Sequence, residues 1–440
     1  MKKFDLVIIG FGKGGKTLAK FAAAQGKKVA VIEKSKEMYG GTCINIGCIP
    51  SKTLVHEGLE HGSFEQAFSR KKDVVTALNN KNYHNLADDD NIEVLDYTAK
   101  FKSNHEVNLL NAQDEIVETV TASHIVINTG AKSVIPPIEG VETSKHLYDS
   151  TGIMNLAFQP KKLVIIGGGY IALEFASMFA NFGTQVTVLE RGEDIMPRED
   201  KEIVKEVKKD LADKNVNIIL NAQTEQFEDT DAGTVVHTTD GTYEADAVLL
   251  ATGRKPNTDL DLENTDIQLG EHGEIKVDEH LQTTATNVYA LGDVKGGMQF
   301  TYISLDDFRI VKDQLFGNGE RSTENRGAVP YTVFIDPPLA RVGLTAEEAK
   351  AQGYNIIENA MPVNTIPRHK INNDPRGLFK AVVNKDTEEI LGATLYGLQS
   401  EEIINLVKLA IDQKLSYKVL KTNIYTHPTM VESFNDLFNM

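Results

Sequence analysis

Cysteine is scarce in this sequence: its 440 residues contain only two, Cys43 and Cys48, with four residues between them. Two cysteines without a nearby pair of histidines fall short of the four ligands of a structural zinc site. A disulfide that closes so short a loop would stabilise the fold by roughly 2 kcal/mol in the chain-entropy model, and a chain of this length has ample core without it. These absences favour a redox dithiol over a metal half-site or a structural disulfide.

The chain also lacks an excess of positive charge and long apolar runs. The formal net charge is −17, whereas nucleic-acid binding requires clustered lysine and arginine. No apolar run approaches the ~20 residues of a membrane span, and the apolar stretch at the N-terminus ends at Gly10, too early for a signal peptide. We therefore expect a cytoplasmic protein of two or three domains, with no nucleic-acid and no membrane partner. In the cytosol, persistent thiol pairs tend to be catalytic or redox-sensing.

The N-terminal stretch has the pattern of a dinucleotide-binding unit. Its predicted elements are a buried strand over 5–10, the glycines Gly10, Gly12 and Gly15 of a G-x-G-x-x-G pattern, a helix over 17–25, and a strand over 28–32 that ends in Glu33. In such a unit the glycines let the backbone approach a pyrophosphate at the helix N-terminus, and the acid binds a ribose hydroxyl.

The same unit occurs again 157 residues downstream. At that offset Gly10, Gly12 and Glu33 correspond to Gly167, Gly169 and Glu190, and alanine, which stands at the third glycine position, is tolerated there. Two dinucleotide sites in one chain imply two dinucleotides and electron transfer between them. Glu190 would repel a 2′-phosphate and favours NADH, but Arg191 adjoins it, so NADH and NADPH both stay open.

The remaining elements are predicted from their local patterns. We expect a helix over 64–86, a β-meander over 92–127, and strands over 125–131 and 248–254 that end in glycine turns. A domain crossing follows at 136–151, then a strand over 288–293, antiparallel strands over 331–334, 378–383 and 390–396, and an amphipathic helix over 401–413. The acids at 88–90 are expected to form a solvated turn, and no metal site is predicted.

Together these features identify a family by resemblance. The dithiol segment 40–52, the two dinucleotide units, Leu291-Gly292-Asp293, and His427-Pro428-Thr429 with Glu432 resemble the class I flavoprotein disulfide reductases, or pyridine nucleotide-disulfide oxidoreductases. Glutathione reductase, lipoamide dehydrogenase and mercuric reductase belong to that family. The resemblance covers essentially the whole chain. It implies an α/β fold with two Rossmann-like domains and an α+β C-terminal dimerisation domain. The implied segments are 1–151 (FAD, first part), 152–282 (NAD(P)), 283–328 (FAD and central segment) and 329–440 (dimerisation).

The resemblance also implies catalytic roles. Hydride would pass from NAD(P)H to FAD, and electrons would then pass to the Cys43–Cys48 disulfide, with Cys48 towards the flavin and Cys43 attacking the substrate. His427, held in its tautomer by Glu432, would be the general acid/base for the dithiol of the other subunit of a homodimer.

Further roles follow from the same resemblance. Lys52 would lie near the flavin with Glu174 as its partner, with a surface salt bridge as the alternative. Tyr170 would cover the flavin until nicotinamide arrives, with core packing as the alternative.

The family also implies which residues bind the two cofactors. For FAD these are Gly10, Gly12, Gly15, Glu33, Lys34, Gly41, Thr42, Lys52, Thr129, Gly130, Gly292, Asp293 and Thr301. For NAD(P)H they are Gly167, Gly169, Tyr170, Ile171, Glu174, Glu190, Arg191 and Gly253.

The features that this chain lacks exclude some branches of the family. It has no cysteine after Cys48, whereas mercuric reductases and large thioredoxin reductases carry a C-terminal pair. The stretches 10–13, 38–41, 81–87, 300–307 and 434–438 resemble bacterial reactive-chlorine-resistance flavoproteins, which reduce hypothiocyanous acid and have also been described as copper(II) reductases. Within them Asp306-Asp307 is unusual, and we expect surface or interface packing for these two acids.

The resulting prediction is an enzyme that passes electrons from NAD(P)H through FAD and the dithiol to a small oxidant, with hypothiocyanous acid first. One alternative is a disulfide reductase of the dihydrolipoyl dehydrogenase or glutathione reductase kind. Another is a flavin-bound redox sensor with little turnover. His427 and Glu432 argue against the sensor, because a sensor does not require a proton relay.

Overall fold

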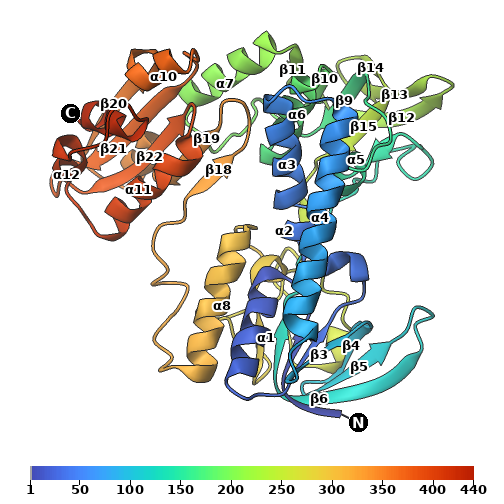
Figure 1. Ribbon diagram of the computed structural model, residues 1–440. Helices are drawn as coiled ribbons and strands as arrows, with labels where there is room; N and C mark the ends of the chain where they lie inside the picture. Colours follow the sequence, from blue (N-terminus) through green and yellow to red (C-terminus); the bar gives the residue numbers. More distant parts are fainter. Residues whose placement is uncertain (1) are drawn as a thin grey trace. The chain divides into compact units, whose positions relative to one another are not determined.

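The computed structural model describes residues 2–440, which form two compact units (Figure 1). The first unit comprises the chain up to Thr53 with residues 66–134 and 253–326, and the second comprises 54–65, 135–252 and 327–440. Helices α3 (Cys48–Leu59) and α4 (Phe64–Ala87) have residues in both. Among the residues described, no helix is both long and apolar enough to cross a membrane.

The first unit is built on a seven-stranded sheet of order β3-β2-β1-β6-β5-β4, with β17 paired to β6. The strands are β1 (Lys2–Ile9), β2 (Val29–Ile32), β3 (Ile92–Leu95), β4 (Thr98–Ser103), β5 (Glu106–Leu110), β6 (Ile116–Ile127) and β17 (Val288–Ala290). The central pairings are parallel, and their strands are buried apolar runs, as expected when both faces are covered. Helices α1 (Lys13–Ala24) and α8 (Thr301–Phe316) pack side by side (Figure 1).

Two expectations for this unit are corrected. Only β4, β5 and the start of β6 form an antiparallel meander, because β3 pairs in parallel with β2 and extends the nucleotide-binding sheet. Helix α1 begins at Lys13, four residues before the predicted start, since Gly14 and Gly15 form its first turn and are buried against neighbouring elements. A short pair, β7 (Ala131–Ser133) with β16 (Arg254–Pro256), completes the unit.

The second unit contains the repeated dinucleotide pattern. Its five-stranded parallel sheet has the order β11-β10-β9-β15-β8, and a three-stranded antiparallel sheet follows β11 in the chain. The elements are β8 (Leu147–Tyr148), α5 (Ser150–Ile153), β9 (Lys162–Ile166), α6 (Tyr170–Asn181), β10 (Gln185–Leu189), α7 (Lys201–Asp213), β11 (Val216–Ile219), β12 (Thr224–Thr230), β13 (Gly233–Thr238), β14 (Thr242–Ala245) and β15 (Ala247–Leu250). The strand, turn, helix and strand predicted from the second glycine pattern are all present.

The C-terminal part of the second unit is an antiparallel sheet of order β18-β19-β22-β21-β20. Helix α11 (Ser400–Asp412) lies on it and buries Ile403, Ile404, Val407 and Ala410, as its pattern predicts (Figure 1). The other elements are β18 (Tyr331–Val333), β19 (Leu339–Gly343), α9 (Ala346–Ala351), β20 (Ile356–Pro362), α10 (Pro367–Ile371), β21 (Leu378–Asn384), β22 (Ile390–Tyr396), α12 (Tyr417–Thr422) and α13 (Phe434–Leu437). The four-part domain division stays a prediction.

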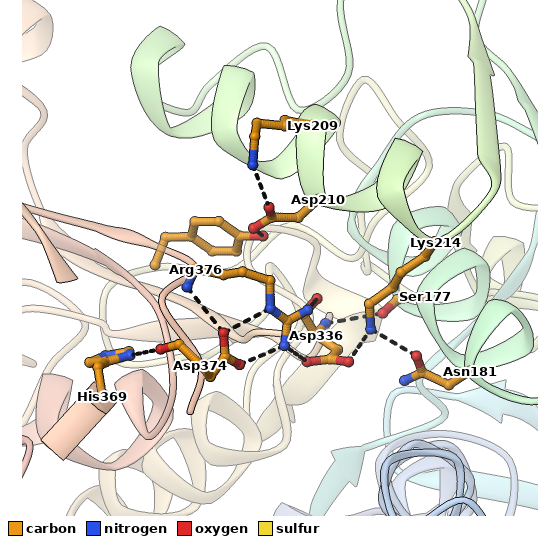
Figure 2. A network of polar contacts seen from close by, with 10 residues as sticks. Ser177, Asn181, Lys209, Asp210, Lys214, Asp336, His369, Asp374 and Arg376 are labelled. Carbon is orange, nitrogen blue, oxygen red and sulfur yellow. Dashed lines mark hydrogen bonds and ion pairs between the residues drawn. The ribbon is translucent and has the colours of Figure 1, made fainter. Parts of the chain in front are cut away.

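A partly buried polar network joins the two halves of the second unit (Figure 2). The Lys214 ammonium donates to the side chains of Asn181 and Asp336, and the Arg376 guanidinium donates to Asp336 and Asp374. Burial opposes ionisation of Asp374, but the hydrogen bonds and charge of Arg376 outweigh it and lower the pKa of this carboxyl. Opposite charges in direct contact therefore allow these side chains to be partly buried.

Candidate active site

The two cysteines lie on consecutive short segments of the first unit. Cys43 is half-buried in α2 (Thr42–Asn45), and Cys48 is exposed at the first position of α3. Both are thiols, and their side chains are hydrogen-bonded to each other. The Thr301 hydroxyl, at the first position of α8, lies 3.4 Å from the Cys48 sulfur. The start of α8 is therefore part of the dithiol site.

The surroundings of Cys43 act on its ionisation in opposite directions. The hydrogen bond with Cys48, followed by burial, raises the pKa of the Cys43 thiol. A hydrogen bond with Thr301 and the positive charge of Lys16 lower it. Because only the thiolate is a competent nucleophile, these last two residues favour the reactive form. Thr301 was predicted from the sequence to contact the cofactor, and no role was predicted for Lys16.

Two stretches that carry the family-branch resemblance, 38–41 and 81–87, meet beside the segment that leads into Cys43. The Lys16 ammonium donates to the Gly40 carbonyl (3.2 Å) and to the Asn82 side chain on α4. The Tyr39 ring stacks on Tyr83 of α4, with ring centroids 4.7 Å apart. Asn79, also on α4, donates to the Lys36 and Glu37 carbonyls, each at 3.1 Å. Helix α4 thus fixes the segment that leads into Cys43.

The first glycine turn is built around the buried Asn128. Its side-chain oxygen accepts from the Gly15 amide (2.9 Å), and its amide group donates to the Leu291 carbonyl (2.8 Å). Gly10 has a φ of +100°, and a Cβ there would lie 2.4 Å from the Asn128 carbonyl oxygen, so only glycine fits. Asn128 therefore joins the turn before α1 to the segment that carries Gly292. The sequence analysis placed Asn128 in a strand and gave it no role.

Other predicted FAD residues lie around this turn. A Cβ at Gly41 would lie 2.7 Å from the Gly12 Cα, so the dithiol segment and the glycine turn are in contact. Glu33 accepts from the Phe11 amide (3.1 Å), and burial raises the pKa of its carboxyl. Burial likewise raises the pKa of Asp293.

The remaining predicted FAD residues lie in the same unit. Lys34 is exposed, and Thr42 begins α2. Thr129 donates to the Asn257 carbonyl, and the Gly130 carbonyl accepts from the Asn257 amide.

The expectation for Asp306-Asp307 is wrong. Both acids are buried, Asp307 completely, where Arg326 forms ion pairs with both of them and Arg321 with Asp306. Asp307 also accepts from the Gly292 amide at 2.8 Å. Lys295, before α8, pairs with Asp307, and Arg309, on α8, pairs with Asp306. These cations neutralise the acids and explain why acids at these positions can be buried.

The second glycine turn lies in the second unit. Gly167 has a φ of +109°, and a Cβ there would lie 2.7 Å from the Ala251 carbonyl oxygen. Glu190 accepts from the Gly168 and Gly192 amides, each at 2.6 Å, so this acid shapes the turn as well as ending β10. Space around the Cβ position of Gly169 is open. Arg191 is exposed, Ile171 is partly exposed on α6, and Gly253, at a φ of +108°, belongs to the first unit.

Tyr170, at the first position of α6, belongs to a cluster that the sequence did not reveal. Its phenol donates to the buried Glu199 (2.6 Å), as does that of Tyr331, and the two rings stack with centroids 5.6 Å apart. Burial, followed by the charge of Glu199, raises the pKa of Tyr170 to about 12. Its predicted gating role stays a prediction.

Glu174 and Lys52 were predicted to form a pair near the flavin. The buried Glu174 carboxylate accepts from the Phe334 amide at 2.9 Å in the second unit. Lys52 is half-buried in the first unit. Their pairing stays a prediction.

His427 and Glu432 are in contact, as the family resemblance implies. The His427 Nδ1 lies 2.8 Å from the Glu432 carboxylate, which also accepts from the Thr429 amide at 3.1 Å. Since a carboxylate accepts, Nδ1 carries the proton in the neutral imidazole, and Nε2 is the proton acceptor. The His427 side chain is 70% exposed, and its service to another subunit stays a prediction. Ile424 beside it is 95% exposed, which is unusual for a large apolar side chain.

The two glycine turns fit dinucleotides. Gly12 and Gly169 precede the first residues of α1 and α6 and have no side chain with which to cap either helix, although Ser304 and Asn128 accept from the Gly14 and Gly15 amides of α1. Their first backbone amides are the groups to which a pyrophosphate binds at a helix N-terminus. Each turn is followed by a strand that ends in an acid, Glu33 or Glu190, which is the position of the ribose-binding residue.

The chain belongs to the pyridine nucleotide-disulphide oxidoreductase family. That family matches residues 4–307, and the family's dimerisation domain matches residues 329–438. This chain is 50% identical, over the full length of both chains, to the probable pyridine nucleotide-disulfide oxidoreductase RclA of Escherichia coli. A mercuric reductase of Staphylococcus aureus is 32% identical over 98% of this chain and 81% of its own. The solved Cu(II) complex of the HOCl-induced flavoprotein disulfide reductase RclA from Escherichia coli matches with a TM-score of 0.97 and 50% identity, covering 100% of this chain and 99% of that chain.

Membership confirms the expected class and fold. The protein is an oxidoreductase of mixed α/β fold, a flavoprotein disulfide reductase that uses FAD and NAD(P)H. The matched dimerisation domain supports a homodimer. The roles of the individual site residues stay predictions.

Proposed function

We propose that this enzyme uses NAD(P)H to reduce a small oxidant, hypothiocyanous acid, at Cys43 and Cys48. The observation that carries the proposal is the local arrangement of the thiols. The hydrogen bond with Cys48 and burial raise the pKa of Cys43, Thr301 and Lys16 act against this and favour its thiolate, and Cys48 is placed to resolve an adduct. When bound, FAD would supply the redox chemistry that links hydride transfer from NAD(P)H to two-electron reduction of the disulfide. The HOCl-induced relative supports an oxidant of the same electrophilic kind.

The proposed steps balance. The thiolate of Cys43 attacks the sulfur of hypothiocyanous acid and forms an S–S bond while the S–O bond breaks, and the departing hydroxide takes a proton to become water. The thiolate of Cys48 then attacks the Cys43 sulfur, forms the disulfide and expels thiocyanate. One NAD(P)H and one hypothiocyanous acid thus give NAD(P)⁺, thiocyanate and water. A small neutral oxidant requires no elaborate pocket.

The other site residues enter the proposal with the roles predicted for them. His427, held by Glu432, supplies and accepts protons at the dithiol of the partner subunit. Lys52 and Glu174 lie near the flavin. Glu33 and Asp293 hold sugar hydroxyls of FAD, and Tyr170 and Glu190 contact NAD(P)H. We also propose that the enzyme works in the cytoplasm, where thiol pairs that persist tend to be catalytic or redox-sensing.

Steady-state turnover tests the choice of oxidant. NAD(P)H oxidation by the purified FAD-containing protein should be rapid with hypothiocyanous acid and poor with glutathione disulfide or lipoamide. The larger disulfides must place a sulfur at Cys43 and find binding contacts, whereas the small oxidant only has to reach the thiolate. Rapid turnover with lipoamide would overturn the proposal in favour of a dihydrolipoyl dehydrogenase. Absence of multiple turnover with every oxidant would favour the redox sensor.

Copper(II) is a second candidate oxidant, because the related RclA has been solved as a Cu(II) complex. Thiolates are ligands that suit copper, and a dithiol can reduce two Cu(II) ions to Cu(I) as it becomes a disulfide. The same assay distinguishes the two candidates. Copper-dependent NAD(P)H oxidation that exceeds turnover with hypothiocyanous acid would make Cu(II) the preferred substrate.

A further inference from the structure

Lys16 is a half-buried cation on α1 that is fixed beside the dithiol segment. Its ammonium donates to the Gly40 carbonyl at 3.2 Å and to the Asn82 side chain. Gly40 precedes Cys43 by three residues, and Asn82 is itself held by a 2.7 Å hydrogen bond to the Leu78 carbonyl. A long flexible side chain is therefore held in one place by two neighbouring elements.

The charges around Lys16 come from several elements. Burial, followed by repulsion from Lys13, lowers the pKa of Lys16 to about 8, while Cys43 acts in the opposite direction. The hydrogen bond with Cys48 and burial raise the pKa of Cys43, whereas Thr301 and the positive charge of Lys16 lower it. Tyr302 on α8 interacts with Cys48. Lys16 is thus a cation that the fold holds beside the dithiol segment and half removes from water, where its effect is less screened.

We propose that Lys16 stabilises the thiolate of Cys43 and so sets the nucleophilicity of the thiol that attacks the oxidant. Lys16 acts through Cys43 and does not touch the substrate, so it is a positioning residue. The inference rests on the proposed role of Cys43 as the attacking thiol, but not on the identity of the oxidant. In this proposal the Lys16 ammonium provides a positive charge beside the dithiol of its own subunit, in addition to the proton relay expected from His427 of the partner subunit.

A purely structural role for Lys16 makes a different prediction. If Lys16 only anchors the Gly40 carbonyl, then any side chain that donates a hydrogen bond there should be equivalent. If its charge acts on Cys43, then Lys16→Arg should preserve the thiolate and Lys16→Gln should not, although glutamine can also donate to a carbonyl. The Arg and Gln variants therefore separate the charge from the anchor.

The test is the alkylation of Cys43 by iodoacetamide in the FAD-containing protein, in a Cys48→Ser background that leaves Cys43 as the single thiol. The rate is followed against pH on both sides of neutrality, with the flavin absorbance spectrum as the check of folding. Lys16→Gln should shift the titration of Cys43 upward by about one pH unit and slow alkylation at neutral pH about tenfold. Lys16→Arg should remain within about threefold of the parent.

Lys20→Met is the matched control, because Lys20 lies one turn further along α1, is 55% exposed and pairs with Asp89. It removes the same charge from the same helix and should leave the titration unchanged. A Lys16→Gln profile that coincides with that of Lys20→Met would overturn the proposal, as would equal slowing in the Gln and Arg variants.

Should Lys16→Gln lose FAD, Asn82→Ala takes its place, since it releases the ammonium from one anchor without changing the charge. Slower alkylation by severalfold would support the proposal, and an unchanged profile would overturn it. Because no physiological oxidant enters this assay, its outcome is separate from that of the turnover test. A normal effect of Lys16 with no turnover of hypothiocyanous acid would reject the oxidant alone.

Discussion

Replacing Cys43 with serine is expected to lower turnover of hypothiocyanous acid by about a thousandfold or more. A serine hydroxyl is not ionised near neutral pH and cannot form a disulfide with Cys48, so both the attack and the resolving step are lost. Reduction of the flavin by NAD(P)H should remain fast, because the nicotinamide does not react with the thiol. Stopped-flow measurement of the two half-reactions distinguishes these effects.

Cys48→Ser is the matched variant. It should also stop multiple turnover, but it leaves Cys43 able to attack once, so a single equivalent of oxidant should still be consumed. If Cys43→Ser retained a tenth or more of the wild-type turnover, the reaction would not depend on this thiol. The proposed chemistry would then be wrong, whichever oxidant is used.

The second large effect is expected for His427→Ala. General acid–base catalysis contributes about a hundred- to ten-thousandfold, so reoxidation by the substrate should slow by that factor while reduction by NAD(P)H stays fast. Glu432→Gln should have a smaller effect in the same half-reaction, because it weakens the hold on the imidazole and leaves the imidazole in place. Equal loss of both half-reactions would contradict the assigned role.

His84→Ala is the control for this variant. His84 is exposed on α4, and its Nδ1 lies 3.1 Å from the Asp88 carboxylate, which is the same kind of pair as His427 with Glu432. No loss is expected in either half-reaction. A mixed dimer of one Cys43→Ser subunit and one His427→Ala subunit tests sharing between subunits. It should recover activity at one of its two sites, whereas each homodimeric variant stays inactive.

The sequence predicts those parts of the site that are encoded by residue patterns within a short stretch of the chain. A glycine pattern bracketed by apolar strand, helix and terminal acid identifies both dinucleotide units, and their strands and helices are where the patterns place them. The cysteine pair stands out because the chain has no other cysteine. His427 and Glu432, five residues apart, are also close enough in sequence for their contact to be predicted.

The residues that sequence reasoning missed depend on distant partners. Asn128 is hydrogen-bonded to Gly15 and Leu291, which lie 113 and 163 residues away. Asp306 and Asp307 were expected in surface or interface packing, and the residues that pair with them include Arg321 and Arg326, which lie beyond the helix that carries the two acids. Such pairings are set by the topology of the sheet and helices, which no local pattern contains.

The central claim is that Cys43 attacks the sulfur of hypothiocyanous acid. The most direct measurement is mass spectrometry of the reduced Cys48→Ser variant after one equivalent of the oxidant, because the resolving thiol is missing and the adduct should accumulate. We predict that an SCN group replaces one hydrogen and maps to the peptide that contains Cys43. Consumption of the oxidant with Cys43 unmodified, or with the group on another residue, would contradict the account.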